Sequence, residues 1–201
     1  MNKLFTSLSV TTGAAFTFIL AGVVPNILDS VTTKPAIAQT GIDVAAVRSS
    51  ALSKHNNYRS THNTPAMTMS NSLNNTAQEW AEYLASNGTF QHSSSSQRNG
   101  AGENIYVYYT TAGSANADTI TKGVKSWYDE VSKYDYNNPG FSGETGHFTQ
   151  VVWKSSTQLG CGAAKGVKTL GGNQYNAFYL VCQYGPAGNV MGQFPANVLK
   201  P

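Results

Sequence analysis

The chain has 201 residues, of which 40% are hydrophobic and 11% are charged, and its formal net charge at pH 7 is +3. Lysine and arginine form no basic run, so the charge pattern does not support a nucleic-acid-binding protein. A chain of this length holds one domain of ordinary size together with an N-terminal leader.

The first 38 residues have the pattern of an export signal. A positively charged start is followed by residues 4–24 without any charge, and Ala36-Ile37-Ala38 supplies the small-x-small pattern of a signal peptidase site. The apolar run is shorter than a comfortable membrane span, although an uncleaved anchor is the alternative reading. We therefore predict a signal peptide at residues 1–38.

The rest of the chain is expected to be a short tail at 39–43 and one domain at 44–201. Export implies a secreted protein, either extracellular or periplasmic, with no permanent membrane anchor after cleavage. We also expect a monomer.

A helical period predicts the first helix. Apolar or aromatic positions recur at spacings of three and four residues on one face: Val44, Val47, Ala51, His55 and Tyr58. His55 lies on this core-facing stripe, so we expect it to be structural and not catalytic.

A second helix is predicted by a similar stripe, and Asn87-Gly88 favours a left-handed stop after it. The stripe consists of Leu73, Ala77, Trp80, Ala81 and Leu84.

The third predicted helix has the most regular period, formed by Ala117, Ile120, Val124, Trp127, Val131 and Tyr134. Glu130 falls about 100° from the centre of this stripe, at the border between core and solvent. A carboxylate there can line a cleft, but periodicity alone favours an ordinary flanking residue.

Three segments after the loop at 137–146 are expected to be strands, because they are rich in β-branched and aromatic residues: 147–153, 158–164 and 176–184. The last of these is apolar on both alternating faces, so it should be covered on both sides. Helices above and below one sheet give an α+β fold, a three-layer α-β-α sandwich with a mainly antiparallel central sheet.

The two cysteines suggest one disulfide in an exported chain. Cys161 and Cys182 are equally far along the chain from Gly171-Gly172, so a two-residue turn there would place them directly opposite each other. Counting outward from the turn puts them at a non-hydrogen-bonded pair, where Cα atoms approach to about 4.5 Å.

Four residues with site chemistry, His92, Glu103, Glu130 and His147, match no local metal or catalytic motif by spacing. Taken alone, His147 is best read as a histidine at the end of a strand. The short sequence motifs around these residues are more informative. In chain order they are His55-Asn56-Asn57-Tyr58-Arg59, Gln91-His92-Ser93, Gly102-Glu103-Asn104, Trp127-Tyr128-Asp129-Glu130, GHFTQVVW at 146–153, LGCG at 159–162 and YLVCQYGPAGNVMGQFP at 179–195.

Together these motifs resemble the CAP superfamily, which includes cysteine-rich secretory proteins, insect venom antigen 5 and plant pathogenesis-related proteins of group 1. The resemblance covers about residues 44–198. It implies an α-β-α sandwich in which His92, Glu103, Glu130 and His147 converge in one open cleft. The first-helix pattern around His55 does not belong to this tetrad.

The sequence departs from the plant and animal pattern because the loop at 142–146 carries no cysteine. With only the Cys161–Cys182 pair left, the chain looks like a bacterial-type, single-domain secreted member. The loops thought to take sterols in eukaryotic relatives are then not held by disulfides, which weakens the case for lipid carriage.

The cleft residues suit a divalent metal such as Zn²⁺, because imidazole nitrogen is a preferred zinc ligand. His92 and His147 would bind directly, and Glu103 and Glu130 either directly or by holding the rings. Two strong ligands imply weak binding. We rank a secreted binding module first, a lipid or small apolar ligand carrier second, and a metal-assisted, peptidase-like hydrolase third. The resemblance implies no established reaction. The natural ligand is expected to be a small molecule, a lipid or a protein.

Overall fold

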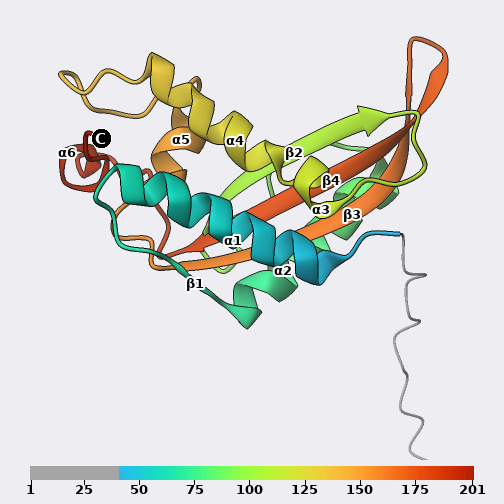
Figure 1. Ribbon diagram of the computed structural model, residues 1–201, viewed down its shortest axis with the longest axis horizontal. Helices are drawn as coiled ribbons and strands as arrows, with labels where there is room; N and C mark the ends of the chain where they lie inside the picture. The colour runs from blue at the N-terminus through green and yellow to red at the C-terminus, as the bar shows by residue number, and fades with distance from the viewer. Residues whose placement is uncertain (1–40) are drawn as a thin grey trace, which may run out of the picture. The chain divides into compact units, whose positions relative to one another are not determined.

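A four-stranded sheet with helices on both faces forms the centre of the computed structural model, which describes residues 41–201 (Figure 1). The strand order is β1-β3-β4-β2. The strands are β1 (Thr68–Met69), β2 (Gly102–Thr110), β3 (Gln158–Leu170) and β4 (Asn173–Gly185). Because β1 runs parallel to β3 and the other pairs are antiparallel, the sheet is mixed. The predicted α-β-α sandwich is confirmed.

The two faces of the sheet are covered by different helices, with α1 in front and α2 behind in Figure 1. The helices are α1 (Val44–Thr61), α2 (Asn71–Asn87), α3 (Ala117–Ile120), α4 (Lys122–Asp129), the 3₁₀ helix η1 (Glu130–Lys133), α5 (Gly146–Val151) and α6 (Phe194–Asn197). Side chains of α1, α3, α4 and α5 share one buried cluster, and those of α2 form another.

Strand β4 separates the two clusters, as its apolar pattern predicted. Phe178, Leu180 and Cys182 point into the cluster under α1, whereas Tyr179 and Val181 point into the cluster under α2. All five are buried. A strand with apolar residues on both faces therefore forms the middle layer.

Helix α2 packs directly on the backbone of β3. A Cβ atom added to Gly160 or Gly162 would lie 2.3–2.4 Å from the backbone of α2, so any side chain there would push the helix away. These glycines set the close approach of α2 to the sheet.

The β3–β4 hairpin confirms the predicted disulfide. Gly171 and Gly172 form the two-residue turn, with φ of 56° and 81°, values that few other residues adopt. Cys161 pairs with Cys182 in the strand register and is bonded to it, with a Cα–Cα distance of 4.2 Å.

Side chains from α1 and α2 satisfy the outer edge of β3 next to the disulfide. The amide of Gln78 donates to the carbonyl oxygen of Ala163 and accepts from its backbone nitrogen, at 2.9 and 3.0 Å. Asn74 accepts from the backbone nitrogen of Cys161, and Arg48 donates to its carbonyl oxygen. Side chains, and not another strand, therefore make the hydrogen bonds to this part of the β3 edge.

The third predicted helix is interrupted, which corrects the continuous helix expected over 117–134. It breaks at Thr121, whose hydroxyl donates back to the carbonyl oxygen of Ala117. Gly123 then packs against the ring of Tyr106, and both Thr and Gly are poor helix formers. The last turn is the 3₁₀ helix η1, which begins at Glu130.

The strand expected over 147–153 is wrong, because residues Gly146–Val151 form helix α5. A short apolar run does not distinguish a buried strand from a buried helix. Contacts distant in sequence decide between them: Glu130 accepts hydrogen bonds at the start of α5, and Arg59 donates to the carbonyl oxygens of Val151 and Trp153 at its end.

At the N-terminal side, Ile42 is buried in the core and Asp43 caps α1 by accepting from the backbone nitrogen of Ala46. The predicted signal peptide lies outside the described residues. From residue 41 onward, the helices are all too short or too polar to cross a bilayer.

Candidate functional site

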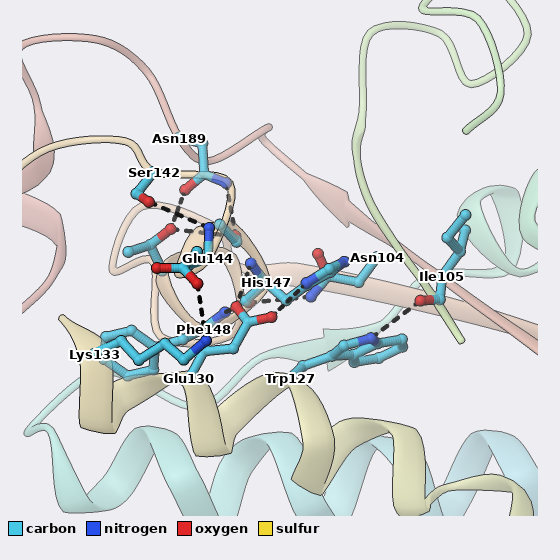
Figure 2. Close-up of polar contacts among 12 residues, drawn as sticks. Asn104, Ile105, Trp127, Glu130, Lys133, Ser142, Glu144, His147, Phe148 and Asn189 are labelled. Atoms are coloured by element: carbon cyan, nitrogen blue, oxygen red, sulfur yellow. Dashed lines mark hydrogen bonds and ion pairs between the residues drawn. The ribbon is translucent and has the colours of Figure 1, made fainter. Parts of the chain in front are cut away.

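One carboxylate holds both the ring and the backbone of His147. Glu130 Oε1 accepts from His147 Nδ1 at 2.7 Å, and Glu130 Oε2 accepts from the backbone nitrogens of His147 and Phe148 at 3.0 and 3.1 Å (Figure 2). The ring also stacks on Trp127, with an interplanar angle of 16°. His147 is therefore fixed in position while a third of its side chain stays exposed.

His92 is paired with Glu103 in a similar way. Its Nδ1 lies 2.9 Å from Glu103 Oε1, and the Glu103 carboxylate also accepts from the backbone nitrogen and hydroxyl of Ser93 and from the amide of Gln183. The Glu103 side chain is 1% exposed, against 51% for His92. Burial alone would raise the pKa of Glu103, but the hydrogen bonds from His92, Ser93 and Gln183 hold it below its ordinary value, which keeps the carboxylate charged.

The two pairs meet at one cavity of about 450 Å³. His92, Glu103 and His147 line it, whereas Glu130 lies behind His147 and does not. Three of the four predicted site residues are thus brought together at the surface of one cavity. The fourth, Glu130, does not line the cavity but holds the ring of His147, which does.

Each histidine is held through Nδ1 by a carboxylate. A carboxylate only accepts, so in the neutral form of each ring Nδ1 carries the proton and Nε2 keeps its lone pair. Neither Nε2 atom has a hydrogen-bond partner among residues 41–201. The arrangement is the one by which proteins orient imidazole as a metal ligand.

No group of three or more His, Cys, Asp or Glu side chains within the described part of the chain is placed to hold a metal ion. The cleft therefore offers two nitrogen ligands, and any further ligand must come from solvent or from a bound molecule.

Buried polar side chains link His55 to the cleft. His55 Nε2 contacts the hydroxyl of Tyr184, and Asn104 donates both to this hydroxyl and to the carbonyl oxygen of His147, at 3.0 and 3.1 Å. His55 is fully buried. It lies in the core and does not line the cavity.

Sequence reasoning missed several residues that build the site. Ser93, Asn104 and Gln183 lie within or beside the motifs that carried the resemblance, so that signal was present. Arg98 also lines the cavity, yet it follows a serine run and no pattern marked it.

A family model described as "CAP: Cysteine-rich secretory protein family" matches residues 52–184. Among curated proteins, Protein PRY2 of Saccharomyces cerevisiae is 40% identical over 151 residues, which cover 75% of this chain and 40% of that protein. The human Golgi-associated plant pathogenesis-related protein 1 is 37% identical over 153 residues, 75% of this chain and 90% of that protein.

Among solved structures, NaASP2, described with Zn²⁺, has a TM-score of 0.58 and 28% identity, covering 77% of this chain and 85% of that one. The chain spans less than half the length of PRY2. The two curated relatives are eukaryotic, so they give no support to the expected bacterial type. The family model, the relatives and the fold agree, and the chain belongs to the CAP (cysteine-rich secretory protein) family.

Proposed function

We propose that the chain is a secreted binding module whose cleft takes a divalent metal ion such as Zn²⁺ between His92 and His147. The observation that carries this proposal is the shared geometry of the two rings. Each donates through Nδ1 to a glutamate, each keeps Nε2 as a free acceptor, and both line the same cavity.

The donor set fits zinc, because neutral imidazole is among its commonest ligands. Glu103 and Glu130 hold the rings in one orientation, as carboxylates behind zinc-bound histidines do. A bound ion would supply a Lewis-acidic anchor for an oxygen of the ligand. Affinity is modest with two protein ligands, and NaASP2, the relative described with Zn²⁺, supports the choice of metal.

Carriage of a lipid or small apolar ligand is the second candidate, supported by the exposed Phe141 at the cavity wall. Metal-assisted hydrolysis is third. It needs a carboxylate free to take a proton from water, and both glutamates are engaged by histidine and by other donors. We assign no reaction to the cleft.

Secretion is proposed from the N-terminal pattern, the Cys161–Cys182 bridge and the family. N-terminal sequencing of protein from the culture medium should begin at Gln39. A chain found only in membranes with its apolar run intact would contradict this proposal.

Calorimetric titration with Zn²⁺ tests the metal site. Wild type should bind one ion, and His147→Ala should lose binding while keeping a near-normal melting temperature, since the backbone contacts of Glu130 remain. Binding should weaken as pH falls, because protons compete for the imidazoles. His55→Ala is the control: it should melt earlier and still bind zinc. Unchanged zinc affinity in His147→Ala would disprove the site.

A further inference from the structure

Arg98 places a fixed cation at the wall of the same cavity. Its Nε donates to the carbonyl oxygen of Ala101 at 2.7 Å, and its Nη1 donates to the carbonyl oxygen of Ser93. Nη1 also lies 3.4 Å from the Ser93 hydroxyl oxygen. The guanidinium is therefore held in one orientation by neutral oxygens on its Nε and Nη1 atoms.

This charge has no counter-ion in the part of the chain that the structure describes. The ion pairs among residues 41–201 do not include Arg98, and the cavity acid Glu103 is paired with His92 instead. Within the same residues, Nη2 has no acceptor. Its two N–H groups are therefore free to donate to an anionic ligand such as a carboxylate.

The charges around the cavity favour a ligand with a single negative charge. Arg98 is the one lysine or arginine among the cavity residues, and the charged carboxylate of Glu103 lies in the same wall. A dianion such as phosphate would meet one cation and one anion. A monoanionic carboxylate meets the same two groups, but Glu103 repels it less strongly than it repels a dianion.

Exposed apolar side chains also lie at the cavity and next to its lining residues in the chain. Phe141 is 55% exposed, and its ring packs over Gly146. Asn189 donates to the carbonyl oxygen of Gly146, and the next two residues, Val190 and Met191, are also exposed. Exposed apolar residues gathered beside a cavity are typical of a ligand site and not of inert surface.

We propose that the cleft binds an organic monocarboxylate, with its carboxylate on Nη2 of Arg98 and its apolar part against Phe141. The volume of about 450 Å³ lies within the range of small-molecule sites, about 300–1,000 Å³. This inference rests on the proposed function as a binding module and names its ligand class. The pairing with Arg98 does not require the metal.

The test compares 4-phenylbutyrate with its neutral amide, 4-phenylbutyramide, by calorimetry and by amide chemical-shift changes at pH 7 with EDTA present. Wild type should bind the carboxylate at least tenfold more tightly than the amide. Arg98→Gln should remove this preference, and Arg98→Lys should keep part of it. Lys133→Gln makes the same change of charge at an exposed ion pair outside the cavity and should behave as wild type.

Equal binding of acid and amide by wild type would overturn the proposal, and this comparison needs no variant to fold. Tighter binding of inorganic phosphate than of 4-phenylbutyrate would overturn the choice of carboxylate. If Lys133→Gln lost the preference for the carboxylate as fully as Arg98→Gln, only the net charge of the protein would matter. This result would also contradict the proposal. Zinc titration of Arg98→Gln separates the two proposals: normal zinc binding without carboxylate binding leaves the metal site standing and removes this inference alone.

Discussion

The Nε2 atom of His55 lies 2.8 Å from the hydroxyl oxygen of Tyr184, and this contact settles the direction of a buried hydrogen-bond chain. His55 Nδ1 lies 2.8 Å from the carbonyl oxygen of Ala51, which only accepts, so Nδ1 carries the proton. Tyr184 must then donate to Nε2 and accept from Asn104. A proton on both ring nitrogens would break this order, so the chain requires a neutral His55.

The first prediction is a pH dependence of stability caused by His55. Burial lowers the pKa of His55 from 6.5 to about 4. Between these values the unfolded chain binds a proton that the folded chain does not, so the free energy of unfolding falls as pH drops from 6.5 to 4, by about 3 kcal/mol. Denaturant unfolding at a series of pH values measures it. His55→Gln should flatten the curve in this window, and a slope equal to that of wild type would contradict the assignment.

The second prediction concerns Glu130, which joins η1 to α5. Glu130→Ala removes the acceptor for three N–H groups and should lower the free energy of unfolding by about 2 kcal/mol or more. Zinc affinity should fall about 10- to 100-fold because the ring of His147 is no longer held. Glu144→Ala is the control, since Glu144 makes an exposed ion pair with Lys133 and should change little. Unaltered zinc affinity in Glu130→Ala would show that ring orientation is unimportant.

The third prediction concerns Arg59, a buried cation that donates to four carbonyl oxygens, those of Pro65, Val151, Trp153 and Ser156. Burial lowers the pKa of Arg59 to about 10, so the side chain remains charged at neutral pH. Arg59→Met leaves these acceptors unpaired and should cost at least about 3 kcal/mol in chemical denaturation. Arg59→Lys keeps the charge on one nitrogen and should lose nearly as much. A fully stable Arg59→Lys would mean that charge, and not the shape of the guanidinium, matters.

The fourth prediction concerns the disulfide. The bridge joins residues 21 apart, and replacing both Cys161 and Cys182 by serine should lower stability by about 3 kcal/mol, because the unfolded chain loses a cross-link. Thermal unfolding of the oxidised protein and of the double variant measures the difference. Two reactive thiols in denatured, unreduced protein would disprove the bridge.

Local patterns predicted the parts of this fold that depend on local contacts. The period of residues 73–84 gave α2, and the spacing of the cysteines about Gly171-Gly172 gave the hairpin register. The helix at 146–151 was missed because its two ends are held by Glu130 and Arg59, far away in sequence. No periodicity encodes such contacts.

The candidate site shows the same division. Spacing could not assemble residues separated by 11 to 27 positions, and the motif resemblance was needed to bring them together. Arg98 stayed invisible to both approaches, because a single arginine after a serine run has no pattern. Arg98 is of interest because no carboxylate among residues 41–201 pairs with it. Only the three-dimensional structure can reveal such an unpaired charge.

The side chains along the outer edge of β3 have a further consequence for how the molecules behave together. An open strand edge is a template on which a second chain can add a strand and begin to aggregate. Near the disulfide, Asn74 and Gln78 occupy the donors and acceptors that such a strand would use. We therefore expect Gln78→Leu to leave the backbone groups of Ala163 open to a strand from a neighbouring molecule.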